Sequence, residues 1–140
     1  MKQFLGFKSL LPILFVLILL SGCGSPVYID GAYTGVSSAD DDGAYAEVNI
    51  TVEDGKISSC DYVTIQSDGA VKDADYGKIN GEVSNQDYYN KAQLAVAAMG
   101  QYARDLVDMG DISDVDVVTG ATIAYDQFRE AVADALADAR

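Results

Sequence analysis

A run of alternating residues at 45–52 constrains the fold of this chain more than any other feature. Apolar and polar side chains alternate along it without interruption, which is typical of a half-buried strand. An Asp-Gly turn follows, and residues 57–65 return as a second strand. The apolar positions of that second strand change phase around Cys60 and Tyr62, as a β-bulge would produce. The sequence therefore predicts an antiparallel hairpin with one buried face.

Two helical patterns follow the hairpin. The first begins at Ser84, a typical helix-capping residue, and ends near 108, just before Gly110. The second covers 123–139, and a short apolar strand at 115–118 lies between them. The two apolar stripes comprise Leu94, Ala95, Ala98, Met99, Tyr102 and Leu106, then Phe128, Val132, Ala135 and Leu136. This order predicts a single small α+β domain with a mainly antiparallel sheet and two principal helices.

Three copies of Asp-Gly-Ala, beginning at Asp30, Asp42 and Asp68, predict tight turns, since Asp-Gly favours the left-handed backbone of such turns. The neighbouring run of acids, 40–42, has carboxylates of the kind that bind calcium. Its spacing is not that of an ordered calcium loop, so a solvated acidic turn is favoured.

The amino terminus has the layout of a secretory signal. Two lysines precede an apolar run at 10–20, which is short for a bilayer span, and Leu-Ser-Gly-Cys follows. This ending resembles a bacterial lipobox, which would make Cys23 the lipidated first residue of the mature protein. We therefore expect a signal peptide over 1–22, a lipid-anchored tether over 23–29, and a place on the extracytoplasmic face of a bacterial cell membrane. An uncleaved anchor and an ordinary signal peptide are the alternatives.

Composition excludes several function classes. Loss of the two leader lysines takes the formal net charge from −13 to −15, and so acidic a domain repels nucleic acid. The chain has no histidine, which removes the usual zinc sites and the Ser-His nucleophile pair. With Cys23 lipidated, Cys60 has no disulfide partner and is expected to be a small apolar core residue. No metal site and no catalytic residue is predicted.

Chemistry concentrates in the segment Asp-Val-Val-Thr-Gly-Ala-Thr at 116–122. Thr122 stands where the last strand meets the last helix, and Gly120 permits a tight turn. Backbone N–H groups at a helix start are unpaired and attract anions, so the place suits a phosphate. The alternative is that Thr122 only caps the helix, with Asp116 ordering the turn through hydrogen bonds to backbone N–H groups.

This segment resembles the Asp-x-x-(Ser/Thr)-Gly-Ala-Thr signature of FMN-binding domains. Further similarities are a Gly-x-Tyr-x-Gly start at 31–35, an Asp-Gly-Lys-Ile hairpin at 54–57, and the pair Tyr76 and Gly77 before the long helix. The resemblance covers 30–140, which would be the FMN-binding domain. Related domains include flavin subunits of sodium-pumping quinone reductases and Rnf-type complexes, and lipoproteins of extracellular electron transfer.

The resemblance implies a set of site residues. Thr122 would carry covalent FMN through a phosphoester made by a magnesium-dependent FMN transferase. Thr119, Gly120 and Ala121 would shape the phosphate loop, and Asp116 would be its acid. Many relatives have a second hydroxyl two residues beyond the acceptor, where this chain has Ala124. Flavin rings pack on aromatic side chains, and the candidates nearest motif-like segments are Tyr33, Tyr76 and Tyr125.

The predicted function is that of a membrane-anchored flavoprotein that carries electrons, with a redox partner that is a protein or a quinone. One alternative is a surface ligand-binding or interaction lipoprotein with the same fold and no covalent flavin. Another is an enzyme of flavin reductase type. The chain has no Gly-x-Gly-x-x-Gly fingerprint and no second domain, which favours a carrier over a stand-alone enzyme.

Overall fold

The computed structural model describes residues 24–140, so the predicted leader and Cys23 lie outside the described residues. Three strands and two helices make up this part, together with one short 3₁₀ turn. Their bounds are β1 Gly31–Val36, β2 Tyr45–Glu53, β3 Lys56–Ile65, α1 Gln86–Met109, η1 Ile112–Asp114 and α2 Thr122–Ala135.

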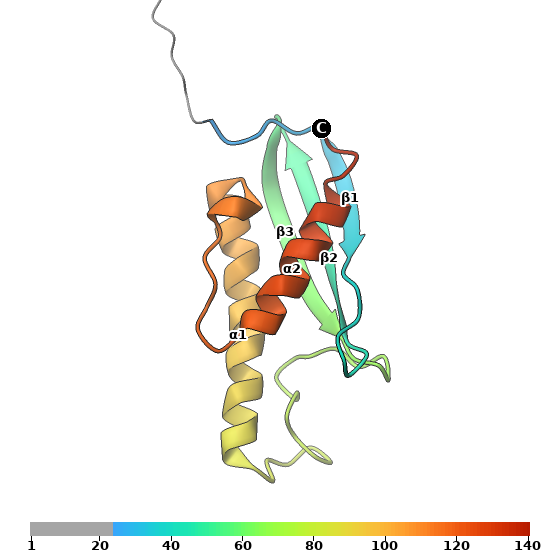
Figure 1. Cartoon of the computed structure of the whole chain (residues 1–140), viewed down its shortest axis with the longest axis vertical. Coiled ribbons are helices and arrows are strands. Elements are labelled where there is room, and N and C mark those ends of the chain that lie inside the picture. Colours follow the sequence, from blue (N-terminus) through green and yellow to red (C-terminus); the bar gives the residue numbers. More distant parts are fainter. Residues whose placement is uncertain (1–23) are drawn as a thin grey trace, which may run out of the picture.

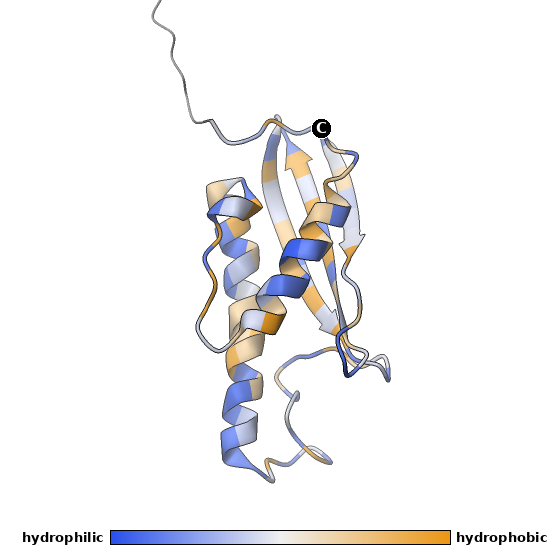
Figure 2. Cartoon of the chain, in the orientation of Figure 1, coloured by the Kyte–Doolittle hydropathy of each residue, from blue (hydrophilic) through white to orange (hydrophobic). Residues whose placement is uncertain are grey.

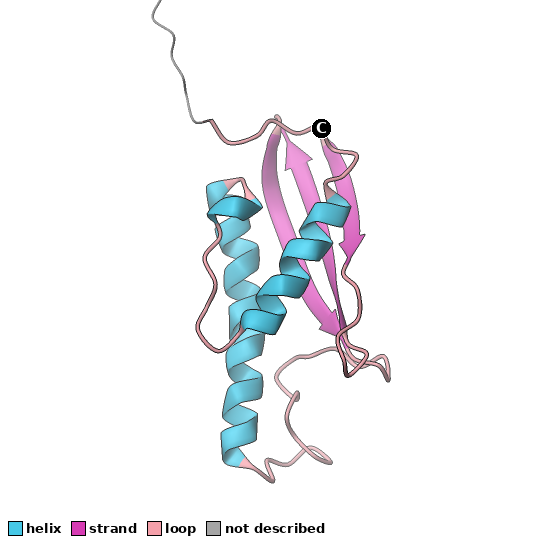
Figure 3. Cartoon of the chain, viewed as in Figure 1, coloured by secondary structure: helices cyan, strands magenta, loops and turns pink. Residues whose placement is uncertain are grey.

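The strands form one antiparallel sheet in the order β1-β2-β3, and both helices lie on the same face of it (Figure 1, Figure 3). α1 packs along β3, whereas α2 crosses β1 and β2. Apolar residues of the sheet and helices face each other between the two layers, and the outer face of α2 is hydrophilic (Figure 2). The predicted α+β fold is confirmed.

Strand β3 contains the expected irregularity, but two residues earlier than predicted. Thr51 pairs with Ser59 and Val52 pairs with Ile57, so Ser58 is the extra residue of the bulge. The bulge moves Ile57 onto the same buried face as Tyr62 and Thr64. The prediction of a β-bulge in this strand was therefore correct, but its position around Cys60 and Tyr62 was wrong.

Helix α1 begins one residue later than predicted. Asn85 is its cap, and the Asn85 side-chain oxygen accepts the Tyr88 N–H at 3.0 Å, so the prediction of Ser84 was wrong. Gly110 ends the helix in the left-handed conformation at φ 76°, as predicted. Leu94 is 42% exposed and does not join the core, because the amino-terminal half of α1 extends beyond the sheet (Figure 1).

The predicted strand at 115–118 does not form, and α2 ends at Ala135, earlier than the predicted 139. The third strand is instead β1, which begins at Gly31 within the first Asp-Gly-Ala copy, so the tight turn predicted there was wrong. The copies at Asp42 and Asp68 do form turns, with the following glycines at φ 81° and 88°.

Candidate functional site

Tyrosine hydroxyls hold the segment that precedes α2. The Val118 N–H donates to the Tyr102 hydroxyl at 2.9 Å, and that hydroxyl donates to the Ala121 carbonyl at 3.3 Å. The Tyr125 hydroxyl donates to the Val115 carbonyl at 2.7 Å. The tyrosine hydroxyls thus form hydrogen bonds with backbone groups that would otherwise bond to a neighbouring strand. This explains why the segment is extended but does not join the sheet.

Tyr102 and Tyr125 are fixed in turn by an aromatic cluster in the core. The Tyr102 ring lies 5.9 Å from the Phe128 ring and 5.4 Å from the Tyr125 ring, centroid to centroid. Tyr62 also stacks on Phe128, with the ring centroids 5.0 Å apart, and donates its hydroxyl to the Ala124 carbonyl at 2.8 Å. Burial raises the pKa of Tyr62 to about 12, so the hydroxyl stays protonated as a donor. The start of α2 therefore rests on a rigid base.

Thr122 is the first residue of α2 and its side chain is exposed. The cap position belongs to Ala121, whose methyl group accepts no hydrogen bond, and α2 has no side-chain cap. The alternative in which Thr122 serves as the helix cap is therefore wrong. The first N–H groups of a helix lack partners within it, so this helix start presents donors and the positive end of a dipole beside a free hydroxyl.

A cavity of about 400 Å³ opens in front of Thr122. Its walls come from five places: the turn after β1, the end of β3, the loop between β3 and α1, the middle of α1 and the start of α2. The lining side chains and backbone are those of Asp40, Asp42, Thr64, Lys72, Tyr76, Ala95, Met99, Gly120, Ala121, Thr122, Ile123, Ala124 and Gln127. The volume lies within the range of roughly 300–1,000 Å³ typical of small-molecule and cofactor sites.

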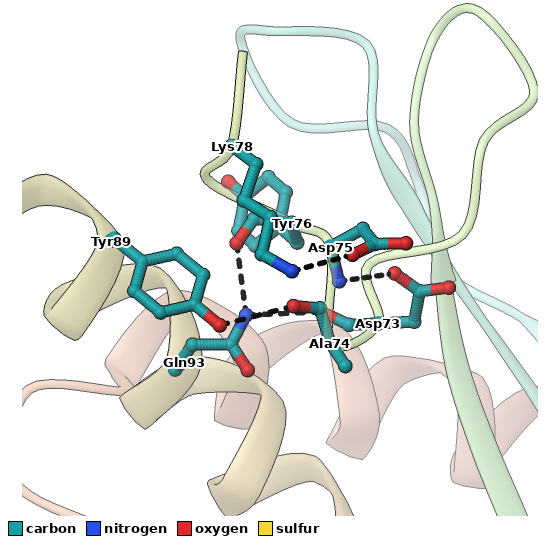
Figure 4. Close-up of polar contacts among 7 residues, drawn as sticks. All are labelled: Asp73, Ala74, Asp75, Tyr76, Lys78, Tyr89 and Gln93. Carbon is teal, nitrogen blue, oxygen red and sulfur yellow. Dashed lines mark hydrogen bonds and ion pairs between the residues drawn. The ribbon is translucent and has the colours of Figure 1, made fainter. Parts of the chain in front are cut away.

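The loop between β3 and α1 supplies Lys72 and Tyr76 to this cavity. Lys72 lies over the Tyr76 ring, with its ammonium 5.0 Å from the ring centroid. Gln93 of α1 donates to the carbonyls of Asp73 and Tyr76 at 3.1 and 2.9 Å, and the Tyr89 hydroxyl donates to the Ala74 carbonyl (Figure 4). These bonds fasten the loop to the part of α1 that extends beyond the sheet.

Comparison with known families identifies the domain. Residues 43–137 match the FMN-binding domain family, which is more than half of the chain. The chain belongs to this family. The FMN-binding domain is thus a flavin-binding protein, with FMN as its cofactor.

Two solved structures are similar to this FMN-binding domain. The CPE2226 protein of Clostridium perfringens shares 28% identity at a TM-score of 0.63, covering 80% of this chain and 88% of that one. A solution structure from Clostridium thermocellum shares 27% identity at a TM-score of 0.45, with 78% and 90% covered. A comparison with curated proteins gives no significant match.

The structure brings four of the seven predicted cofactor-binding residues to the cavity of the FMN-binding domain: Tyr76, Gly120, Ala121 and Thr122. Gly120 has φ 87°, a left-handed conformation that favours glycine, whereas a Cβ there would meet only the end of the flexible Leu94 side chain, at 2.9 Å.

The other three predicted residues lie elsewhere. Asp116 and Thr119 are exposed and do not line the cavity, and Gly77 lines a neighbouring hollow on the far side of Tyr76. Within the described residues Asp116 makes no hydrogen bond to the turn, which the tyrosine hydroxyls order instead. Its predicted structural role is therefore wrong, because Tyr102 already satisfies the backbone groups that the carboxylate was expected to reach.

Sequence reasoning missed several residues of the cavity wall. Lys72 and Gln127 were not singled out, and the acidic turn at 40–42 was read as solvated surface. Gln127 is buried and donates to the Ala44 carbonyl at 2.8 Å, which fixes that turn beside α2. The apolar pattern gave no signal for these residues, although a polar residue on the buried stripe of α2 was a clue at Gln127.

The remaining candidates lie away from the cavity. The Tyr33 hydroxyl donates to the Ile29 carbonyl, and Tyr125 belongs to the aromatic cluster, so of the three predicted stacking residues Tyr76 alone lines the site. Burial, together with the smaller effect of the Asp61 charge, raises the pKa of the half-buried Cys60 thiol to about 12. Within residues 24–140 there is no group of three or more acidic, histidine or cysteine side chains that could hold a metal ion. Neither of the two helices in this part of the chain is long and apolar enough to cross a bilayer.

Proposed function

We propose that this FMN-binding domain is a lipid-anchored extracytoplasmic electron carrier whose FMN is esterified to Thr122. The observation that carries the proposal is the exposed Thr122 hydroxyl, which lines a cofactor-sized cavity at the uncapped start of α2. A phosphoester there would lie next to unpaired backbone N–H groups, which stabilise its negative charge.

The residues of the cavity fit the cofactor by type. Gly120 and Ala121 keep side-chain bulk away from the phosphate position, and Ala95, Met99 and Tyr76 provide apolar and aromatic surface for a flat ring. When bound, FMN supplies the redox chemistry, while the protein supplies position and electrostatics. A covalent bond suits a protein outside the cell because it retains the cofactor whatever the noncovalent affinity.

The test is to co-express the full chain with an FMN transferase and to measure the intact mass of the purified protein. We expect a mass gain equal to esterified FMN, retained in Thr122→Ser and abolished in Thr122→Ala. Thr34→Ala is the control, since Thr34 is an exposed threonine of β1 that lies outside the motif and does not line the cavity.

Two outcomes separate the proposal from its alternatives. An unmodified mass, in the presence of a transferase that modifies a known substrate, contradicts the covalent carrier and supports a module without covalent flavin. Rapid turnover of small-molecule acceptors by the purified holoprotein contradicts the carrier role and supports an enzyme of flavin reductase type.

A further inference from the structure

Residues 24–29 are fastened to one end of the domain from the first described residues onward. The Ser25 hydroxyl donates to the Met109 carbonyl at 3.2 Å, the Tyr28 N–H donates to the Gly55 carbonyl at 3.0 Å, and the Ile29 N–H donates to the Ala139 carbonyl at 2.8 Å. Tyr28 is buried at 4% exposure. The segment that was predicted to be a tether is therefore part of the folded domain (Figure 1). Only Gly24 separates Cys23 from the first residue that is hydrogen-bonded to the domain.

The cavity lies far from this end of the domain. The lengths of α1 and α2 give two estimates of the distance, and the estimates agree. Helix α2 has Thr122 at the cavity and Ala135 near the fastened segment, a length of roughly 20 Å at 1.5 Å per residue. In α1, Ala95 lines the cavity and Met109 contacts Ser25, again roughly 20 Å apart.

The two ends differ in their surfaces. Val27, Ile29 and Met109 are 80%, 57% and 41% exposed, so the fastened end presents apolar side chains that suit a membrane interface. The cavity end presents Asp40 and Asp42 in the cavity wall, and three further aspartates lie on the loop around Tyr76: Asp68, Asp73 and Asp75. Exposed carboxylates also lie at the fastened end, at Asp30, Glu53, Asp54 and Asp108, so the orientation depends on the fastened segment and the apolar side chains and not on charge.

We propose that the domain stands on the bilayer on its Val27–Ile29–Met109 end and holds its flavin roughly 20 Å out in the water, where the redox partner is a protein with a basic surface. The inference rests on the proposed function and names the partner class. In the exchange the reduced flavin is oxidised, and a redox centre of the partner protein is reduced by the same electrons. A quinone head group within the bilayer does not reach the cavity.

The orientation is tested without flavin, on the lipidated full chain in vesicles. A dye is attached to Glu53→Cys, at the fastened end, or to Asp41→Cys, in the turn beside the cavity; both replace exposed acids. Cys60→Ala removes the native thiol, whose raised pKa already makes it a poor competitor for the label. Head-group-labelled quencher lipids should quench the dye at position 53 at least threefold more than the dye at 41. Equal or reversed quenching, or a mature protein without lipid on Cys23, overturns the inference.

The partner class is tested on the reduced holoprotein in the same vesicles. A basic one-electron haem protein in solution should oxidise the flavin at least tenfold faster than a long-tailed quinone dissolved in the bilayer, with a rate that falls as salt rises. A quinone rate as fast as that of the haem protein, or a rate independent of salt, overturns the inference. Failure of flavin attachment would count against the proposed function alone, because the dye measurement would still decide the orientation.

Discussion

Lys72 contributes a positive charge to a cavity wall that also contains Asp40 and Asp42. The Asp40 carboxylate accepts the N–H groups of Asp42 and Ala44 at 3.0 and 2.9 Å, which occupies it in its own turn. Lys72 has a different contact, with its ammonium over the Tyr76 ring. A cation next to a flavin favours the reduced, anionic form of the ring by Coulomb attraction. Lys72 is thus the side chain in this wall that is best suited to raise the cofactor potential.

Replacing Lys72 by methionine should lower the midpoint potential of the holoprotein. An interaction on the order of 1 kcal/mol corresponds to about 20 mV for a two-electron couple. The measurement is an equilibrium redox titration at low salt. Lys56→Met is the matched control, since it removes the same charge from the first residue of β3, at the other end of the domain. An equal shift in both variants would show that net charge, and not position in the cavity, sets the potential.

The sequence predicted the acceptor side of the site well, because Gly120, Ala121 and Thr122 are consecutive and their chemistry is local. It did not predict Lys72, which comes from a loop without periodicity, or Gln127, which lies further along α2 at a buried position where an apolar residue is the rule. Residues brought together by tertiary packing leave no spacing in the chain that a pattern can detect. Asp116 shows the converse, because it belongs to the motif but is exposed and does not line the cavity.

At the scale of elements, the contact between α2 and β1 depends on one glycine. Gly35 is buried beneath α2, and a Cβ built there would overlap the Ala131 carbonyl oxygen and the Ala135 backbone nitrogen. The atoms it would meet belong to a helix backbone, which cannot move aside as a flexible side chain can. The glycine therefore sets how closely the helix lies on the sheet, and so where its first residue, Thr122, stands.

Gly35→Ala should reduce the free energy of unfolding by about 3 kcal/mol or more, because α2 must lift from β1 to admit the methyl group. Urea denaturation measures the change. Gly31→Ala is the matched control in the same strand, where the added Cβ meets only the Tyr33 side chain at 3.2–3.3 Å, and it should cost less than about 1 kcal/mol. Similar losses in the two variants would show that α2 is not held at this contact.

The elements themselves were predictable to different degrees. Alternation in β2 and the apolar stripe of α2 depend on burial of one face, and both were predicted correctly. β1 was missed because its residues give little apolar alternation, with glycines at two of its six positions, although its burial does alternate in the structure. The segment 115–118 was predicted as a strand because its apolar residues suit one, but buried tyrosine hydroxyls offered its backbone other partners.

At the scale of the whole molecule, the most prominent property is the large negative net charge. The chain has 22 acidic and nine basic residues, and within residues 24–140 the Lys78–Asp75 contact at 2.7 Å is the one ion pair. Most carboxylates therefore repel one another without local compensation, which opposes compactness at neutral pH. The fold holds because the carboxylates remain at the surface while the aromatic and alanine-rich core is closed.

Raising sodium chloride from low concentration to 0.5 M at pH 7 should raise the melting temperature, because screening weakens this repulsion. A gain of about 1 kcal/mol would correspond to roughly 4 °C for a domain of this size. Thermal denaturation followed by circular dichroism provides the measurement. At pH 4, close to the sequence pI of about 4.1, the same salt step should have little effect. A melting temperature independent of salt at both pH values would contradict the argument.

The tyrosine hydroxyls beneath residues 115–121 have a consequence for how the cofactor would be installed. Three phenol hydrogen bonds hold this stretch, and its Val115 and Ala121 are buried in the core, so moving it would open the core. An enzyme that modifies Thr122 does not have to move it, because the Thr122 side chain is already exposed. Attachment of the cofactor would therefore leave the folded domain undisturbed.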